Sequence, residues 1–329
     1  MLKVGLIGCG GMGSVHAVVW SEMMNKAELV AVADLNQDKW QKFTDKLGAK
    51  FYKDAYEMME KEGLDVVDIC TPTVTHAVYA ITATEHVKHV LVEKPICLYD
   101  EEAELLLKAE KETGATIHVA HVNRFNANSR YLKKLVDTGI YGKIVTADFH
   151  RFSPDPVWVI DHNNPAKTGG MAIDLHIHDV DFVRYLMGGD PDGLNSTVHK
   201  RPDGTVDHIW ASYRYGDTII SSECSWDFPV SMPFNKGFTV RFEKATVVFS
   251  LNRPLTVYTE DGEVFEPELE ETETRDLGIN IKNFGDFVRE LTSFADAIID
   301  GNKKSPVPLS EAISAMRLIR RELNEARLQ

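Results

Sequence analysis

The stretch of sequence that decides the fold is Lys3–Gly13, which reads KVGLIGCGGMG. A short apolar run, typical of a buried strand, leads directly into three glycines at the spacing G-x-G-x-x-G, and a helical pattern follows. Gly8 permits a tight turn, Gly10 lets the backbone approach a diphosphate, and Gly13 lets the helix pack closely on the strand. The sequence therefore predicts a strand–turn–helix unit with an anion site at the helix N-terminus.

A second apolar run, Leu29–Ala33, strengthens this prediction because it ends in Asp34. The interval of about twenty residues after the last glycine is where a dinucleotide-binding βαβ unit carries its ribose-binding acid. The alternative is an ordinary βαβ turn with a solvated aspartate, and the strand–turn–helix context favours the cofactor site. We predict cofactor contacts at Gly8, Gly10, Gly11, Met12, Gly13 and Asp34.

The carboxylate of Asp34 also bears on which dinucleotide is bound. It can accept hydrogen bonds from the adenosine ribose hydroxyls, whereas it repels a 2′-phosphate. Two like charges about 4 Å apart cost about 1 kcal/mol in water and about 4 kcal/mol at an intermediate dielectric. The residues that follow, Leu35–Gln37, include no arginine to offset the repulsion. We therefore expect NAD, with about tenfold to several-hundredfold discrimination against NADP.

Length, charge and cysteine content limit the class of protein. The 329 residues suffice for about two domains. A net charge of −14 without a basic run argues against nucleic acid or an anionic membrane as a partner. No apolar stretch approaches the ~20 residues that span a bilayer, and the immediate first strand leaves no room for a signal peptide. Four scattered cysteines suit reduced thiols, so we expect a cytoplasmic protein.

Residues 1–120 alternate strand and helix patterns. The apolar runs Val66–Cys70, His89–Glu93 and Thr116–Ala120 predict buried strands, and an amphipathic helix is expected at Asp100–Thr113. Repeated βα units imply a doubly wound α/β domain with a parallel sheet covered on both faces. Its ligand is expected at the carboxyl ends of the strands.

The pattern changes in the second part of the chain. Between residues 193 and 265, β-type runs follow one another with turn signals at Arg214–Asp217, Asn235–Gly237 and Glu260–Gly262. Strands without intervening helices favour an antiparallel sheet. We therefore expect a Rossmann domain at 1–121 and an α+β substrate-binding domain at 122–329, whose terminal helices can pack back on the first.

The end of the fifth strand carries the first motif with chemical potential, Glu93-Lys94-Pro95. A strand at this position should present its carboxyl end to the nicotinamide. An ammonium group there can neutralise charge that develops on a substrate oxygen. A lysine before a proline is otherwise most often a solvated surface residue, so the motif alone leaves both interpretations open.

The second motif is GGMAIDLHIHDVD at residues 169–181, which we expect on a helix over about residues 171–187. Two glycines at its start allow a ligand to approach closely. Spacings of four and three place Asp174, His178 and Asp181 on one helical face, where carboxylates can orient an imidazole that carries a proton near neutral pH. The alternative is a helix face that satisfies its own polar groups.

The irregular segment before this helix contains Trp158 and His162 among short polar side chains. Aromatic faces and amides suit a polyhydroxylated ligand, although loops of this composition are also common without a function. We predict that these two residues contact the substrate.

A metal site is the other interpretation of residues 176–181. His176, His178 and the neighbouring aspartates partly match the ligand motif of some metallohydrolases. On a helix, however, two residues in alternate positions point about 200° apart, so both histidines cannot easily bind one ion. We expect no metal.

Together these motifs resemble the Gfo/Idh/MocA oxidoreductases, a family named for glucose–fructose oxidoreductase, inositol dehydrogenase and a rhizopine-catabolism protein. The glycine turn, Thr71-Pro72-x-x-x-His76, the lysine–proline pair and the D-x-x-x-H pair come in that family's order and spacing. The resemblance covers nearly the whole chain. It implies an N-terminal Rossmann domain and a C-terminal α+β domain with a large open, mainly antiparallel sheet. Because that sheet commonly mediates assembly, we expect a homodimer or homotetramer.

The resemblance also implies roles for individual residues. Lys94, Asp174 and His178 correspond to the family's catalytic lysine, aspartate and histidine, and a cis peptide bond is expected before Pro95. The resemblance also places Thr71, Pro72 and His76 around the cofactor. We further predict cofactor contacts at Glu93 and Lys94, and the predicted substrate contacts are Lys94, Asn123, Arg124, Trp158, His162, Asp174 and His178.

Among family members the chain is most similar to myo-inositol 2-dehydrogenases and related sugar dehydrogenases. It departs at His121–Phe125, where many inositol enzymes have a glycine-initiated, arginine-rich segment, so inositol itself is not implied. We expect NAD-dependent oxidation of a secondary alcohol on a cyclitol or sugar-like ring, or the reverse reduction. Two alternatives remain open: an NAD-retaining glycosidase or epimerase that acts by transient oxidation, and a non-catalytic dinucleotide-binding sensor or subunit.

Overall fold

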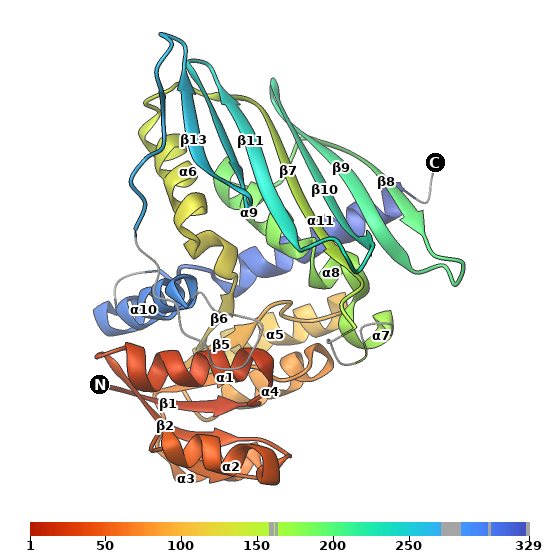
Figure 1. Ribbon diagram of the computed structural model, residues 1–329. Coiled ribbons are helices and arrows are strands. Elements are labelled where there is room, and N and C mark those ends of the chain that lie inside the picture. Colours follow the sequence, from red (N-terminus) through yellow and green to blue (C-terminus); the bar gives the residue numbers. More distant parts are fainter. Residues whose placement is uncertain (158–160, 162–163, 271–283, 302–303, 327–329) are drawn as a thin grey trace. The chain divides into compact units, whose positions relative to one another are not determined.

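The computed structural model describes the chain except for residues 158–160, 162–163, 271–283, 302–303 and 327–329. The chain divides into two compact units. Figure 1 labels helices and strands of both. The first unit comprises Met1–Phe125 and Glu271–Ile313, and the second comprises Asn126–Glu270 and Ser314–Gln329. Among the helices described, none is long and apolar enough to cross a bilayer.

The first unit is built on a six-stranded parallel sheet with the order β3-β2-β1-β4-β5-β6. The order reverses between β1 and β4, and folds of this kind bind their ligand at the carboxyl ends of the strands at that point. The expected doubly wound parallel sheet is therefore confirmed. Its strands are β1 (Leu2–Ile7), β2 (Ala27–Ala33), β3 (Lys50–Tyr52), β4 (Val66–Ile69), β5 (His89–Glu93) and β6 (Thr116–Ala120).

The helices of the first unit have clear local start and stop signals. At the start of α5 the Glu102 carboxylate accepts the Tyr99 N–H at 3.0 Å, and Gly114 ends the helix at φ +71°. The elements are α1 (Gly11–Val18), a π-helical turn η1 (Val19–Met23), α2 (Gln37–Lys46), α3 (Ala55–Lys61), a 3₁₀ turn η2 (Thr73–Thr75), α4 (His76–Ala83), α5 (Asp100–Thr113), a 3₁₀ turn η3 (Val122–Phe125) and α10 (Gly285–Asp300).

Helix α10 returns late in the chain to the core of the first unit. Its Phe294 is almost fully buried, with ring centroids 5.4 Å from His118 and 6.0 Å from Phe125. The segment after it pairs with β6 through a bridge between His118 and Pro308. The apolar face of α10 is therefore core packing of this unit.

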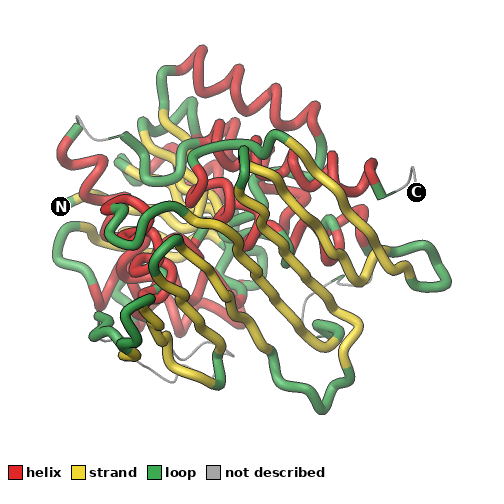
Figure 2. Tube along the Cα trace, turned by 90° about the horizontal axis from the view of Figure 1, so that it is seen from above, coloured by secondary structure: helices red, strands yellow, loops and turns green. Residues whose placement is uncertain are grey.

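The second unit is built on an eight-stranded sheet with the order β14-β13-β12-β11-β7-β10-β9-β8 (Figure 2). Only β7 and β10 pair in parallel among these strands, which confirms the expected, mainly antiparallel sheet. Its strands are β7 (Ile144–Pro154), β8 (Gly193–Lys200), β9 (Val206–Tyr215), β10 (Thr218–Phe228), β11 (Asn235–Phe242), β12 (Ala245–Ser250), β13 (Arg253–Thr259) and β14 (Val264–Phe265).

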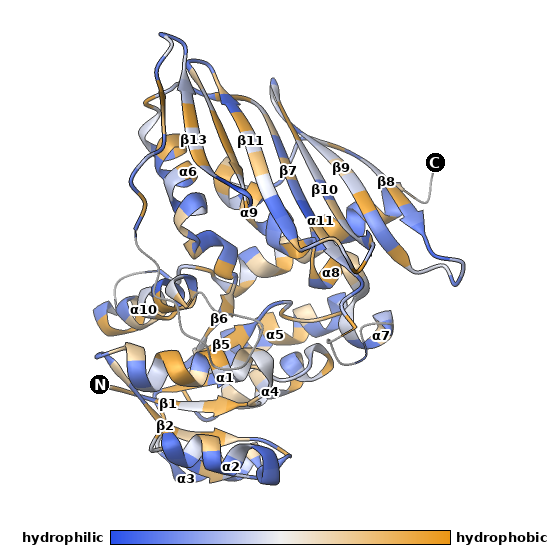
Figure 3. Cartoon of the chain, viewed as in Figure 1, coloured by the Kyte–Doolittle hydropathy of each residue, from blue (hydrophilic) through white to orange (hydrophobic). Residues whose placement is uncertain are grey.

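The two faces of this sheet differ, as the alternating hydropathy along its strands shows (Figure 3). In β9, Ile209 and Tyr213 are fully buried, whereas Trp210 between them is 43% exposed. On the buried face Met171 and Leu323 pack around Ile209. The helices of this unit are α6 (Ala127–Thr138), α7 (Pro165–Thr168), α8 (Gly170–Asp174), α9 (Ile177–Met187) and α11 (Leu309–Glu325), the last of which begins in the first unit.

The prediction of one helix over residues 171–187 is wrong. Helix α8 ends at Asp174 and α9 begins at Ile177. At the junction the N–H groups of Leu175 and His176 both point to the Met171 carbonyl, at 2.9 and 3.1 Å. The imidazole of His176 is buried against Glu322 of α11 at 3.0 Å, a contact that fixes the junction.

The predicted turn at Asn235–Gly237 is also wrong, because these residues open β11 and pair with β7. Gly237 lies opposite His150, and a Cβ at Gly237 would lie 2.7 Å from a carbon of that ring. The glycine is therefore needed for close packing between strands. The chain turns earlier, where the Met232 N–H donates to the Pro229 carbonyl at 2.8 Å.

Candidate active site

The glycine turn between β1 and α1 has the geometry that its spacing predicts. Gly8 has φ +87°, and a Cβ there would lie 2.8 Å from the Cys70 carbonyl oxygen. A Cβ on Gly13 would lie 1.9 Å from the Gly8 carbonyl oxygen, so no side chain fits. At Gly10 and Gly11, by contrast, a Cβ would meet nothing within 4 Å. The turn thus leaves open backbone at the start of α1, which fits the diphosphate of a dinucleotide.

Asp34 follows β2, and two main-chain N–H groups hold its carboxylate. Oδ2 accepts the N–H of Cys9 in the glycine turn and Oδ1 accepts the N–H of Asn36, each at 2.8 Å. Lone pairs remain for further donors such as ribose hydroxyls. Burial and the neighbouring Asp34 carboxylate raise the pKa of Cys9 to about 12, so this thiol stays protonated.

A hollow is formed by the residues that follow Asp34 in the chain, Leu35, Asn36, Gln37 and Asp38, together with Lys53. The exposed Lys53 is a cation that sequence reasoning missed, because it follows β3 and is distant in sequence from the glycine turn. Because Asp38 lines the same hollow, the charges of these two residues oppose one another there.

The Thr71, Pro72 and His76 motif connects the ends of β4 and β5. The two ring nitrogens of His76 lie 2.8 Å from the carbonyl oxygens of Thr71 and Pro95. Burial lowers the pKa of this imidazole, although both carbonyls act in the opposite direction. His76 therefore braces the loops that follow the two strands.

The Glu93-Lys94-Pro95 motif lies at the carboxyl end of β5, as expected. The Lys94–Pro95 peptide bond is cis, which confirms that expectation. Glu93 is 6% exposed, and its Oε2 accepts the main-chain N–H of Lys94 at 3.0 Å. Lys94 itself is only half-buried. The main chain around Lys94 thus contacts a buried side chain on each side, Glu93 at its N–H and His76 at the carbonyl of Pro95.

Two predicted substrate contacts, Asn123 and Arg124, lie in η3 after β6. Both are buried, with 8% and 6% exposure. The Arg124 N–H donates to the His121 carbonyl at 3.0 Å, and its guanidinium reaches the Pro306 carbonyl at 3.5 Å. In the first unit, therefore, Arg124 joins η3 to the segment before α11.

In the second unit the D-x-x-x-H pair is divided between two helices. Asp174 ends α8 and His178 lies in the first turn of α9, and both are half-buried. Asp181, one turn further on, is fully buried. Asp174 and His178 are therefore accessible to a ligand, and Asp181 is not.

The residues between and after these two polar groups have structural partners that the sequence did not reveal. Glu322 accepts from the Tyr213 hydroxyl at 2.7 Å in addition to its contact with His176. Asp179 forms a buried bidentate ion pair with Arg151, at 2.8 and 2.7 Å. His176 and Asp179 thus hold α9 in place through these partners.

The segment before α8 is described only in part. Gly169 and Gly170 have φ values of +81° and +65°, a left-handed conformation that favours glycine. Trp158 and His162, which were predicted to contact the substrate, lie outside the described residues.

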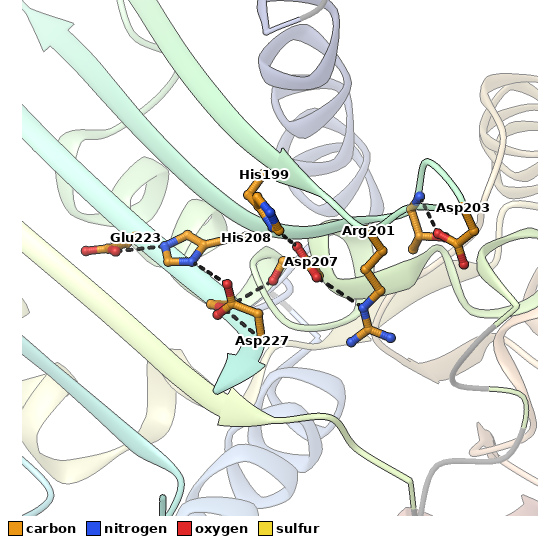
Figure 4. A network of polar contacts seen from close by, with 9 residues as sticks. His199, Arg201, Asp203, Asp207, His208, Glu223 and Asp227 are labelled. Carbon is orange, nitrogen blue, oxygen red and sulfur yellow. Dashed lines mark hydrogen bonds and ion pairs between the residues drawn. The ribbon is translucent and has the colours of Figure 1, made fainter. Parts of the chain in front are cut away.

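A separate polar network lies on β8, β9 and β10 (Figure 4). His199 Nδ1 and Arg201 Nε contact the two carboxylate oxygens of Asp207 at 2.8 and 3.1 Å. His208 lies between Glu223 and Asp227, at 2.8 and 3.3 Å. His199, Asp207 and Asp227 are close enough for metal ligands, but the Arg201 cation pairs with the same carboxylate. The network therefore links β8, β9 and β10 through polar contacts, among them the Arg201–Asp207 ion pair.

The sheet order, the open glycine turn and the acid after β2 define a dinucleotide-binding domain. Residues 2–121 match the oxidoreductase family with an NAD-binding Rossmann fold, and residues 129–248 match the C-terminal domain of the same Gfo/Idh/MocA family. The chain belongs to the Gfo/Idh/MocA oxidoreductase family. NAD is its cofactor, and the resemblance identified from the sequence motifs is confirmed.

Several curated relatives are dehydrogenases of sugars or inositols. Glucose-6-phosphate 3-dehydrogenase of Bacillus subtilis is 32% identical over 260 residues, which are 73% of this chain and 71% of the relative. Myo-inositol 2-dehydrogenase of Thermotoga maritima is 32% identical over 190 residues, 57% of this chain and 55% of the relative. The match to scyllo-inositol 2-dehydrogenase (NAD(+)) of Bacillus subtilis, 34% identical, also covers 57% and 55%. The chain thus spans about half the length of these two inositol relatives.

The solved structures agree on the fold. Levoglucosan dehydrogenase, in complex with NADH and levoglucosan, superimposes with a TM-score of 0.85 and 22% identity, covering 99% of this chain and 97% of that one. A probable dehydrogenase from Thermotoga maritima gives a TM-score of 0.83 and 24% identity, with 99% and 97% covered. At these identities the likeness shows the fold alone.

Proposed function

We propose that this chain is an NAD-dependent dehydrogenase that oxidises a secondary alcohol of a cyclitol or sugar-like substrate, or reduces the corresponding ketone. The relatives with sugar and inositol dehydrogenase names support the substrate class. The carboxylate of Asp34, held at its place by two main-chain donors, supports the preference for NAD over NADP.

We assign the proton chemistry to three side chains. His178 takes the hydroxyl proton as general base, and Asp174 orients the imidazole and hydrogen-bonds a neighbouring substrate hydroxyl. The ammonium of Lys94 stabilises the negative charge that develops on the substrate oxygen. Asn123, Arg124, Trp158 and His162 remain proposed substrate contacts.

When bound, NAD would supply the acceptor for the hydride of the carbinol carbon. The open backbone at Gly10 and Gly11 would hold the diphosphate, and Asp34 would accept the ribose hydroxyls. Met12, Thr71, Pro72 and Glu93 complete the proposed cofactor contacts. His76 would act through the loops that it braces, because both of its ring nitrogens already face carbonyl groups.

The observation that carries this proposal is the pattern of exposure along α8 and the start of α9. Asp174 and His178 are half-buried, whereas His176 and Asp179 are buried. A helix face that merely satisfied its own polar groups would not leave the carboxylate and the imidazole as the accessible pair.

The test is a substrate screen with matched variants. The purified protein is incubated with NAD and a panel of inositols, aldoses, sugar phosphates, glycosides and amino sugars, and NADH is followed by absorbance. Lys94→Ala and His178→Ala should abolish turnover of the best substrate. Lys88→Ala, which removes an exposed lysine just before β5, is the control and should not. Normal turnover in either active-site variant would refute the assignment.

The same screen distinguishes the two alternative functions. An NAD-retaining glycosidase or epimerase would consume a substrate without net NADH, which product analysis by chromatography would reveal. A sensor or subunit would bind NAD in a calorimeter and turn over no member of the panel. Net NADH formation would exclude both as the main activity.

We further propose that the protein is a cytoplasmic homodimer or homotetramer. The open face of the second sheet exposes the large apolar side chains of Trp210 and Ile219, at 43% and 54%. Contact with a second copy would cover them. Light scattering coupled to gel filtration tests this proposal, and a monomer at micromolar concentration would contradict it.

A further inference from the structure

A group of ionisable side chains is buried in the first unit beneath the carboxyl ends of β4 and β5. It consists of His16 in α1, Asp68 in β4 and Glu93 in β5, with Glu290 of α10 facing them. His16, Asp68 and Glu290 are fully buried and Glu93 is 6% exposed. None of the functions proposed above uses His16, Asp68 or Glu290.

Hydrogen bonds and ion pairs connect this group in a line. Asp68 Oδ2 accepts the indole N–H of Trp20 at 2.7 Å and lies 2.8 Å from His16 Nδ1. The other ring nitrogen, His16 Nε2, lies 3.3 Å from Glu93 Oε1, within ion-pair distance but without the geometry of a hydrogen bond. The second oxygen of Glu93 accepts the main-chain N–H of Lys94. The line therefore runs from a buried tryptophan to the backbone of the proposed catalytic lysine.

The charges of the group agree with this geometry. Burial opposes a charge on His16, but the Asp68 carboxylate 2.8 Å from its ring outweighs it and raises the pKa of the imidazole well above its ordinary value. Burial, and then the proximity of Glu93, raise the pKa of Glu290 well above the usual range, so this acid is neutral. Burial likewise raises the pKa of the Cys70 thiol. One imidazolium thus lies between two carboxylates, with a neutral acid and a neutral thiol beside it.

We propose that His16 and Asp68 are positioning residues for Lys94: the ring of His16, anchored by Asp68, holds the Glu93 carboxylate where it accepts the Lys94 N–H. This inference rests on the proposed function of Lys94. The ring of a second histidine, His76, lies 2.8 Å from the carbonyl oxygen of Pro95 on the other side. Two buried histidines from different helices thus fix the segment from which the ammonium projects.

Such support matters because catalytic groups must be held within about 0.5 Å of their productive positions. A displacement of about 1 Å can lower the rate about 10²-fold. If the ring of His16 is replaced, Glu93 loses its charged neighbour and the Lys94 amide loses a fixed acceptor. We therefore expect His16→Gln to lower turnover about 10- to 100-fold while NADH affinity changes less than about threefold.

The direct test measures the Lys94 amide and needs no substrate. The protein is labelled with ¹⁵N-lysine, the Lys94 resonance is assigned by its loss in Lys94→Arg, and its hydrogen-exchange rate is measured by NMR. His16→Gln should accelerate exchange at Lys94 at least tenfold. The matched control is His89→Gln, at the amino end of the same strand β5, which should change it less than twofold. Melting curves and NADH fluorescence show that each variant is folded and binds cofactor.

A double-variant comparison shows whether His16 acts through Glu93. Once Glu93→Gln has removed the carboxylate, adding His16→Gln should change neither Lys94 exchange nor turnover further. If His16→Gln changed Lys94 exchange or turnover by the same factor in Glu93→Gln as in the native protein, the proposal would be overturned. If His16→Gln does not fold, Asp68→Asn takes its place and is measured in the native protein and in Glu93→Gln. An equal effect of Asp68→Asn in both proteins would overturn the proposal as well.

Other outcomes also bear on the proposal. Unchanged Lys94 exchange in folded His16→Gln would refute it, and so would faster exchange with unchanged turnover. His16, Asp68 and Cys70 are close enough to bind a metal ion. A stoichiometric metal in the native protein that is lost in His16→Gln would show that these residues bind a metal, and it would overturn the positioning role. Failure of the proposed function is distinguishable, because Lys94→Ala would then turn over normally whatever the exchange rates.

Discussion

Replacing Asp34 by asparagine should change the choice between NAD and NADP. The carboxylate is half-buried and fixed by the N–H groups of Cys9 and Asn36, so it cannot turn away from a 2′-phosphate. A like charge about 4 Å away costs about 1 kcal/mol in water and about 4 kcal/mol at an intermediate dielectric. Because the carboxylate is partly exposed to water, we expect a value near the lower end. The native protein should thus bind NADH about tenfold more tightly than NADPH.

Calorimetric titration of both reduced cofactors at low and high salt measures this preference. Asp34→Asn keeps the size of the side chain and removes its charge, so the ratio of the two affinities should fall about tenfold. Asp45→Asn removes the same charge from α2 outside the hollow and is the control. Equal binding of NADH and NADPH by the native protein would refute the electrostatic argument. An unchanged ratio in Asp34→Asn, or the same shift in the control, would refute it as well.

Three further predictions concern activity and stability. Lys94→Ala and His178→Ala should each lower turnover at least about 10²-fold while NADH binding, followed by fluorescence, stays within threefold; a large loss of binding would contradict their catalytic roles. Asp179→Ala should destabilise the protein by about 3–5 kcal/mol in urea unfolding, because it leaves a buried guanidinium without its carboxylate; a loss below 1 kcal/mol would argue against this ion pair. Burial lowers the pKa of His118 to about 3, so the unfolded chain binds this proton first and stability should fall as the pH drops below about 6.5, by about 2 kcal/mol at pH 5. Urea unfolding at pH 7 and pH 5 should show a smaller fall in the free energy of unfolding for His118→Gln than for the native protein. In the control His86→Gln, which changes an exposed histidine, the fall should equal that of the native protein.

Sequence reasoning was accurate where the physical requirement is local. The bounds of β5, α5 and β6 agree with the predicted ranges, because continuous apolar runs and a terminal glycine at position 114 mark them without long-range help. The requirement at Gly8 is equally local, since a positive φ is needed for the turn itself. The cis bond before Pro95 was expected from family resemblance and not from any local pattern.

It failed where a distant residue decides the local structure. The break between α8 and α9 depends on the contact of His176 with Glu322, which lies 146 residues further on. Gly237 looked like a turn residue, but its role is to make room for His150 on the neighbouring strand. No periodicity in a single sequence reveals which partner a side chain will meet across a sheet.

The candidate site shows the same division. Glu93 and Lys94 are adjacent in sequence, so their contact at the end of β5 could be anticipated. The imidazole of His16 and the acid of Glu290 come from α1 and α10, which lie far apart in the chain. Their place beneath the lysine is a product of the tertiary fold, and neither residue belongs to a motif that sequence reasoning could identify.

The division of the chain between its two units limits how the protein can be cut or recombined. The polypeptide passes from one unit to the other at residues 125/126, 270/271 and 313/314, so no uninterrupted gene fragment encodes either half. A fragment ending at Phe125 would lack α10 and expose the apolar surface around His118 that Phe294 normally covers. During synthesis on the ribosome, the first half therefore cannot complete its core until α10 has emerged. Chimeras that exchange substrate preference between relatives need three junctions for the same reason.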